Sequence, residues 1–223
     1  MIHVGPVWYQ HSWGIIPISF VSAAALGVLT TYYGGTYDVL VGLIHLLVVI
    51  AFARVFIMPR TSRSMSLPMS WLWLGLLVQL GASACMAYLT SSVMIGDAVL
   101  YHRMAVGLAS GSIDLGSLRW YGTPMVAILA SLWYRLFGVS FLGMFFVSGV
   151  VSYLAKCLIL RSIGLLTDEP RTRQLTATLI LWLPSFSAWN GMLGKEPYIS
   201  LGIAMTLYGV SLSQRSRVRG GVC

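Results

Sequence analysis

The feature that most constrains this chain is a series of long apolar runs that alternate with short polar segments. The runs that mark candidate membrane spans are residues 14–33, 38–58, 69–95, 139–160, 174–190 and 197–212. Only 9% of the 223 residues are charged, whereas about a quarter of a soluble domain is charged. Because roughly 20 apolar residues cross a bilayer as a helix, we expect an all-α fold class, a polytopic transmembrane helical bundle of about six spans.

One further apolar run, residues 124–137, differs from the others in its length. Thr123 can cap a helix at its start, Pro124 suits the first helical position, and Gly138 suits the end. At 1.5 Å per residue such a helix reaches about 21 Å, which is less than the hydrocarbon thickness of about 30 Å. We therefore expect an interfacial helix in the first large external loop instead of a further span.

The basic residues favour the same interpretation, because they gather in three clusters between apolar runs. The clusters are Arg54, Arg60 and Arg63; Lys156, Arg161, Arg171 and Arg173; and Arg215, Arg217 and Arg219. All three share one side of the membrane only if an even number of spans separates each pair, so the short run must not cross. Six spans with both termini cytoplasmic then obey the positive-inside rule.

The whole chain, 1–223, is expected to form a single integral membrane domain. It divides into two leading spans in 1–68, a core portion in 69–212 and a basic tail in 213–223. The net charge of +8 does not indicate nucleic-acid binding, because the arginines form no single patch. We expect a multi-pass protein surrounded by membrane lipid, in a bacterial inner membrane.

The longest polar stretch, residues 96–122, follows the third predicted span and is expected on the extracytoplasmic side. A helix is predicted to begin at Asp97, where the helix dipole favours a carboxylate. Tyr101 follows one turn later on the same face, with His102 beside it, and Arg119 comes near the end of the stretch. The interpretation without a function is that Asp97 only caps a helix at the membrane boundary.

A second polar segment lies between Pro184, which should end or kink the fifth span, and Pro197, which can open the sixth. It carries Lys195 and Glu196 and is expected in the same compartment as Asp97. Charged residues this close to hydrocarbon are costly and often functional. The alternative is a solvated pair of opposite charges in a loop, which contributes little energy.

Together the two segments fit a substrate whose phosphate lies at the membrane surface and whose tail lies in lipid. Arginine or lysine side chains would hold the phosphate. A carboxylate could accept a proton from an attacking hydroxyl group. No motif with metal-ligand spacing accompanies them, and the three cysteines are far apart.

The order of these motifs resembles the N-terminal half of the GT-C superfamily of polyprenyl-phosphate-sugar-dependent glycosyltransferases, which includes protein O-mannosyltransferases and lipid A aminoarabinose transferases. The resemblance covers roughly residues 80–212. It rests on Asp97-x-x-x-Tyr101, Gly122-Thr123-Pro124, the segment Leu132-Trp133-Tyr134-Arg135-Leu136-Phe137-Gly138, and Leu183-Pro184-Ser185.

The resemblance implies an inverting transfer of a sugar from a polyprenyl-phosphate donor. Asp97 would be the catalytic carboxylate that activates the acceptor, and Glu196 a second acidic residue of the site. Lys195 and Arg119 would bind the lipid phosphate, with Tyr101 and His102 as further substrate-binding candidates. No cofactor is indicated by the residues themselves, although some members hold a divalent metal with acidic residues at this place.

Other interpretations stay open. The chain lacks the Lys-Pro-Pro segment, the additional spans and the C-terminal domain that many members have, and two extra spans precede its Asp97 loop. These differences favour either a partial enzyme or a non-catalytic accessory or assembly subunit with a partner membrane chain. A transporter-like module is less favoured, because the charges gather at the expected external surface instead of the midplane.

Overall fold

The computed structural model describes residues 36–93, 96–117 and 123–220, and every regular element in these ranges is helical. The elements are α2 (Thr36–Phe52), a π-helical segment (Ala53–Ile57), α3 (Met58–Met65), α4 (Met69–Val93), α5 (Asp97–Ser110), a 3-10 turn (Leu115–Ser117), α6 (Thr123–Phe137), α7 (Phe141–Leu166), α8 (Pro170–Trp182), α9 (Pro184–Trp189) and α10 (Glu196–Gly220). The all-helical prediction is confirmed for these residues. The predicted span 14–33 lies outside them.

Within the described residues, three helices are long and apolar enough to cross a membrane. They are Leu40–Met65, Met69–Ser92 and Phe141–Leu166, and each coincides with a run predicted to span. The predicted spans 174–190 and 197–212 also fall on helices, but neither α8 with α9 nor α10 is among these three. The membrane character is thus supported, and the count of six spans stays a prediction.

The first of the three is longer than predicted, because α2 continues through the π-helical segment into α3. Pro59 stands in the first turn of α3, where its missing N–H is tolerated. The helix ends where Ser66 adopts a left-handed conformation (φ 55°), two residues before Pro68. Met58 and Met65 are buried, so tertiary packing extends the helix beyond the apolar run.

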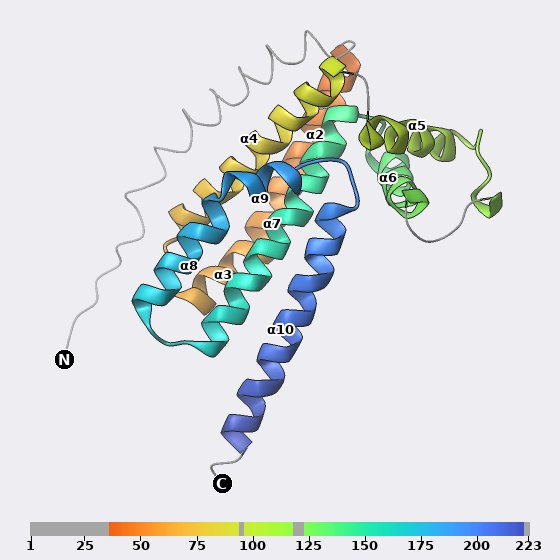
Figure 1. The fold of residues 1–223 in the computed structure, drawn as a ribbon. Helices are drawn as coiled ribbons and strands as arrows, with labels where there is room; N and C mark the ends of the chain where they lie inside the picture. Colours follow the sequence, from red (N-terminus) through yellow and green to blue (C-terminus); the bar gives the residue numbers. More distant parts are fainter. Residues whose placement is uncertain (1–35, 94–95, 118–122, 221–223) are drawn as a thin grey trace.

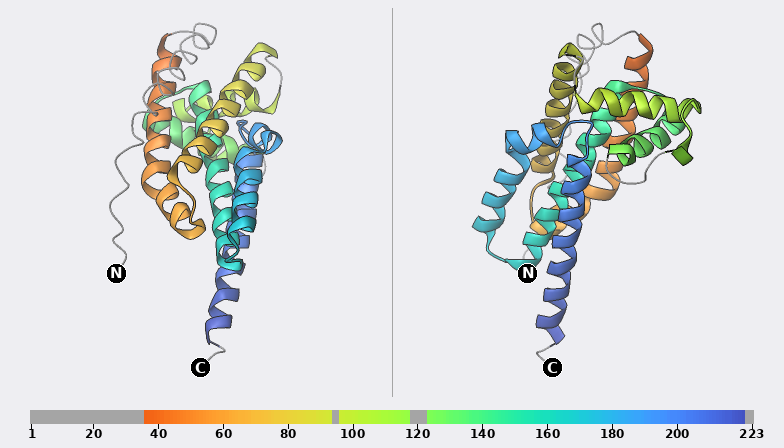
Figure 2. Two further views of the ribbon diagram at one scale, coloured as in Figure 1. Left: turned by 90° about the vertical axis from the view of Figure 1, so that its left-hand side faces the viewer. Right: turned by 45° about the vertical axis from the view of Figure 1, so that its right-hand side comes forward.

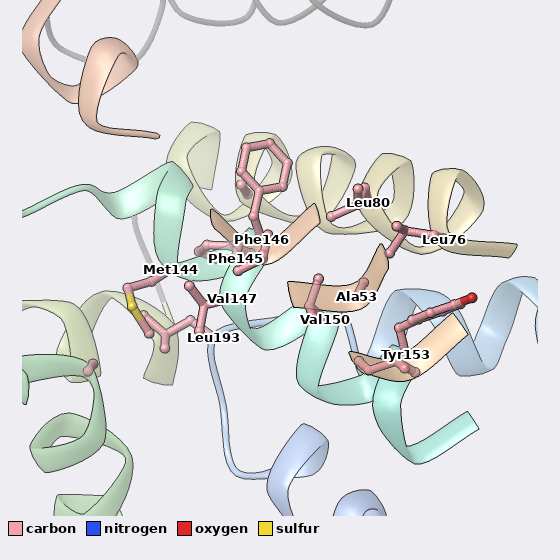
Figure 3. Packing of buried hydrophobic residues seen from close by; sticks show 14 of the residues in the cluster. Ala53, Leu76, Leu80, Met144, Phe145, Phe146, Val147, Val150, Tyr153 and Leu193 are labelled. Carbon is pink, nitrogen blue, oxygen red and sulfur yellow. The ribbon is translucent and has the colours of Figure 1, made fainter. Parts of the chain in front are cut away.

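α7 is the central helix of the bundle and packs against α2, α4 and α10. Figure 3 shows Leu76 and Leu80 of α4 facing Phe146 and Val150 of α7. Farther along α7, the hydroxyl group of Tyr153 donates a hydrogen bond of 2.9 Å to the carbonyl of Leu72 on α4. A helix that is apolar on all sides is buried among others, and α7 has this character.

α5 and α6 do not run along the bundle. Figures 1 and 2 show them projecting sideways near one end, across the direction of the long helices. Arg135 of α6 donates a 2.6 Å hydrogen bond to the carbonyl of Leu108 near the end of α5, which holds the two helices together. Gly138 (φ 91°) makes the turn from α6 into α7. Residues 124–137 therefore form a short apolar helix, and its interfacial position stays a prediction.

The predicted break at Pro184 is confirmed. α8 ends at Trp182, Leu183 is extended (φ −65°, ψ 110°), and α9 begins at Pro184. Proline cannot donate to the preceding turn and disfavours a helical conformation in the residue before it.

The six carboxylates of the chain all lie in the described residues, at helix ends or in links. Asp38, Asp97 and Glu196 begin α2, α5 and α10, Asp114 lies between α5 and α6, and Asp168 and Glu169 lie between α7 and α8. The chain reverses between consecutive long helices, so α2 begins and α4 ends at the end of the bundle from which α5 projects, and α10 begins below that end, near the level of α6 (Figures 1 and 2). Arg63, Arg171 and Arg173 lie at the opposite end, at the junctions of α3 with α4 and of α7 with α8.

Two basic residues depart from their predicted clusters. Arg54 lies in the π-helical segment, in the middle of the Leu40–Met65 helix instead of near its end. Lys156 was grouped with Arg171 and Arg173 on a cytoplasmic surface, but its side chain is fully buried in the middle of α7. The prediction was wrong because apolar residues continue to Leu166, so the helix extends beyond Lys156 for more than two turns.

We expect Gly143→Ala to destabilise the bundle. A methyl group on Gly143 of α7 would overlap the imidazole ring of His45 on α2, and overpacking costs about 1–3 kcal/mol. Gly81→Ala in α4 is the matched control, because a methyl group there meets nothing within 4 Å. Thermal unfolding of the purified variants tests this, and equal melting temperatures for the two would contradict the described contact between α2 and α7.

Candidate functional site

Asp97 occupies the place that the sequence predicted, at the start of α5. Its side chain is exposed, and Gly96 before it adopts a positive φ of 133°, a conformation that glycine tolerates. The positive end of the helix dipole stabilises the ionised carboxylate. The geometry therefore offers an accessible carboxylate at the edge of the bundle.

Tyr101 lies one turn farther along α5, but its side chain is 2% exposed and belongs to the apolar core. Helical spacing predicted Tyr101 one turn from Asp97 on the same face, and the structure buries Tyr101 while Asp97 stays exposed. The Tyr101 side chain therefore contributes to the packing of the core and is not exposed beside Asp97.

His102 is the predicted residue with the most specific surroundings. Its Nδ1 lies 2.6 Å from the hydroxyl oxygen of Tyr134 on α6, and its ring packs edge-on against Phe141 with centroids 5.1 Å apart. Burial lowers the pKa of His102, and the nearby charges of Asp38 and Arg103 act in opposite directions. The imidazole is therefore held neutral. In the tautomer with Nε2–H, its Nδ1 accepts a hydrogen bond from the Tyr134 hydroxyl group.

Tyr134 is almost completely buried, and burial together with the charge of Asp38 raises its pKa well above its ordinary value. The phenol therefore stays protonated over the physiological range and remains available as a hydrogen-bond donor to His102.

The sequence interpretation missed Asp38, which joins this cluster from α2. One carboxylate oxygen accepts a hydrogen bond of 2.9 Å from the backbone N–H of Phe141, and Ser140 donates one of 3.0 Å to the Asp38 carbonyl. The other oxygen, Oδ2, is buried without a hydrogen-bond partner among the described residues. Because 103 positions separate Asp38 from Phe141, no local pattern could have predicted this contact.

Lys195 and Glu196 lie at the start of α10. Lys195 is exposed, and the Glu196 carboxylate lies beside Gly194, where an added methyl group would meet Oε2. The simple Lys195–Glu196 loop pair is not found: within the described ranges the ion pair present is Arg173–Asp168, at 2.8 Å. Lys195 therefore remains an exposed cation at the start of α10.

The structure places the two predicted segments in the same half of the bundle without joining them directly. α5 projects near the end of the bundle and α10 begins lower, near the level of α6 (Figures 1 and 2), and no hydrogen bond or ion pair links Asp97 to Lys195 or Glu196 in the described part of the chain. A cleft of about 470 Å³ lies at the opposite end instead, lined by residues that include Leu67, Trp71 and Arg173. Arg119 lies outside the described residues.

A divalent metal is the cofactor that the family resemblance allows. Among the residues that the structure describes, no group of three or more His, Cys, Asp or Glu side chains could hold a metal ion. Asp97 and Glu196, the two acidic candidates, begin different helices, α5 and α10. The donor set therefore does not fit a metal, and no step is derived through one.

No family model, curated protein or solved structure matches the chain. The function must therefore be argued from the residues and their geometry.

We expect the folded protein to lose stability as the pH falls below about 6.5, the ordinary pKa of histidine, partly through His102. Because the pKa of His102 is lowered by burial, the unfolded chain takes up the proton first, and protonation then favours unfolding. His102→Gln should flatten the decline in melting temperature between pH 7.5 and 5.5.

Tyr134→Phe is the matched control, since it removes the hydrogen bond and leaves the imidazole group in place. It should lower stability at every pH while keeping the pH-dependent decline. An unchanged decline in the His102→Gln protein would show that His102 is not the group that titrates.

Proposed function

We propose that this chain is a membrane glycosyltransferase-like protein that transfers a sugar from a polyprenyl-phosphate donor to an acceptor on the extracytoplasmic side. The observation that carries the proposal is the placement of α5 and α6 across one end of the bundle, with Asp97 at the start of α5. This arrangement offers a carboxylate where an aqueous acceptor and a lipid-borne donor can meet.

The distribution of basic residues between the two ends of the bundle supports an extracytoplasmic position for Asp97. Arg63, Arg171 and Arg173 lie at the end opposite α5, and the positive-inside rule gives that end to the cytoplasm. Asp97 and Glu196 then face the outside. The inner membrane of a bacterium is the membrane in which we expect this orientation.

In the proposed reaction, a hydroxyl oxygen of the acceptor attacks the anomeric carbon of the donor sugar. The bond between that carbon and the phosphate oxygen breaks, and the lipid phosphate leaves with the bonding electrons. Asp97 accepts the hydroxyl proton as general base, and attack opposite the leaving group inverts the anomeric centre. Lys195, an exposed cation near the membrane surface, would bind the departing phosphate, and Arg119 and Glu196 are further candidates for the site.

The second candidate is a non-catalytic accessory subunit of a larger membrane assembly. The apolar side chains exposed on α10, among them Ile203, Leu207 and Val210, favour it, because they could meet a partner membrane chain as well as lipid. Under this alternative the protein copurifies with its partner and tolerates substitution of Asp97.

We expect Asp97→Asn to reduce sugar transfer roughly a hundredfold or more, the loss typical of removing a general base. The assay follows transfer of labelled sugar from a polyprenyl-phosphate donor in membranes that contain the protein. Asp114→Asn is the matched control, because Asp114 is also exposed and follows α5. Full activity of the Asp97→Asn protein at normal expression would remove the catalytic role.

The topology predicts that cysteines placed at 97 and 195 react with a membrane-impermeant maleimide from one side, and a cysteine at 171 from the other. Cys85 and Cys223 are first replaced, whereas Cys157 is buried and can be kept. Labelling is compared in intact cells and in inverted vesicles. Positions 97 and 195 in different compartments would overturn both the topology and the proposed site.

A further inference from the structure

Lys156, in the middle of α7, is fully buried and has an unusual set of neighbours. Its ammonium nitrogen lies 2.6 Å from the hydroxyl oxygen of Ser187 on α9 and 5.3 Å from the centre of the Phe186 ring. Lysine is almost never fully buried unless it is paired with an opposite charge. A hydroxyl group and a ring face supply no such charge.

No carboxylate of the described chain can neutralise Lys156. All six acidic residues are described and stand at helix ends or in links, and the ion pair found in these ranges, Arg173–Asp168, belongs to the α7–α8 junction. A buried cation without a counterion is strongly unfavourable, and an ionisable residue inside a membrane bundle generally marks a functional site.

Further polar side chains of α4 and α7 are buried without hydrogen-bond partners among the described residues. At 100° per residue, Ser148, Ser152 and Lys156 lie on one face of α7 within a sector of about 80°. Gln79 and Ser83 lie one turn apart on α4; Gln79 hydrogen-bonds Ser187, and Ser83 packs against Gly149 of α7 and Gly191 beyond α9. The atoms without a hydrogen-bond partner in the described ranges are Gln79 Oε1 and the hydroxyl oxygens of Ser83, Ser148 and Ser152.

The unmet hydrogen-bonding capacity of this group includes donors and acceptors, but its one formal charge is positive. A charged Lys156 has two N–H groups beyond the one directed at Ser187, and Ser83, Ser148 and Ser152 each have an O–H and acceptor lone pairs. Gln79 adds an acceptor oxygen. An oxyanion would supply the negative charge that the described interior does not hold and would accept hydrogen bonds from these donors.

We propose that the interior between α4, α7 and α9 is a binding site for a phosphate-type oxyanion, centred on Lys156 and completed by the hydroxyl groups of Ser148, Ser152 and Ser83. The anion is either free phosphate or the phosphate of a lipid headgroup. This site is independent of the transfer reaction proposed for Asp97.

α9 is the element that opens the site. It has six residues, follows the extended Leu183, and is held to the bundle through Ser187, whose hydroxyl group bonds Lys156 and whose carbonyl accepts a 3.1 Å hydrogen bond from Gln79. Outward rotation about Leu183 frees Lys156 from Ser187 and exposes the serine hydroxyl groups to the incoming anion.

The test uses the fact that Lys156 and Lys195 are the two lysines of the chain. The full-length Lys195→Arg protein, in phosphatidylcholine nanodiscs, is reductively methylated with ¹³C-formaldehyde, and modification of Lys156 is followed by NMR and peptide mass spectrometry. We expect slow methylation that inorganic phosphate suppresses saturably, about fivefold or more, because a bound anion holds the ammonium group. Sodium chloride at equal ionic strength should not do so.

A second arm identifies the source of the anion. Nanodiscs of phosphatidylcholine mixed with phosphatidic acid should protect Lys156 without added phosphate if a lipid headgroup binds, and should leave it reactive if only free phosphate binds. Either result supports the site.

Ser152→Ala keeps Lys156 and should weaken the phosphate effect about tenfold, the effect of losing a hydrogen bond to a charged group. Ser162→Ala is its control, because Ser162 is also a buried serine of α7 but bonds the carbonyl of Leu158. The proposal is overturned if phosphate and phosphatidic acid both act no differently from chloride and phosphatidylcholine. It is equally overturned if Lys156 resists methylation in every condition.

Discussion

The whole structure depends on the burial of α7. Its apolar side chains pack against α2, α4 and α10, and glycines at the helix surface let the neighbours approach closely, as Gly143 does for His45 and Gly149 for Ser83. Small residues at such contacts are typical of helices that associate within a membrane. Because the middle of the bundle is filled in this way, all six carboxylates stand at helix ends or in links, where water or backbone N–H groups can satisfy them.

Local signals in the sequence were sufficient for most of the helices. Long apolar runs predicted the three helices that can span a membrane, Pro184 predicted the break between α8 and α9, and the run between Pro124 and Gly138 predicted the short α6. Each of these features is decided by neighbouring residues, either through hydrophobic length or through the restricted backbone of proline and glycine. The prediction of helix ends was less accurate where tertiary packing sets them. An example is α3, which continues to Met65 because both its methionines are buried.

The candidate site was less predictable, because its contacts join distant parts of the chain. Helical spacing correctly placed Asp97 and Tyr101 one turn apart, but it could not show that α6 covers Tyr101 and leaves Asp97 exposed. The partner of His102 is Tyr134 on the next helix, and the charge that acts on both belongs to Asp38, far earlier in the chain on α2. Only packing in three dimensions brings these groups together.

Asp38 and Lys156 differ in whether α7 compensates their charge. Asp38 accepts the backbone N–H of Phe141 at the start of α7, where the positive end of the helix dipole also stabilises a carboxylate. Lys156 lies ten residues before the end of α7, too far from its C-terminus for the dipole to compensate an ammonium group, because that effect is confined to the last turn. The helix therefore supplies a partner for the acid at its start and none for the base in its middle. Since the carboxylates of the described chain stand at helix ends or in links, the partner proposed for Lys156 is an anion that comes from outside the described chain.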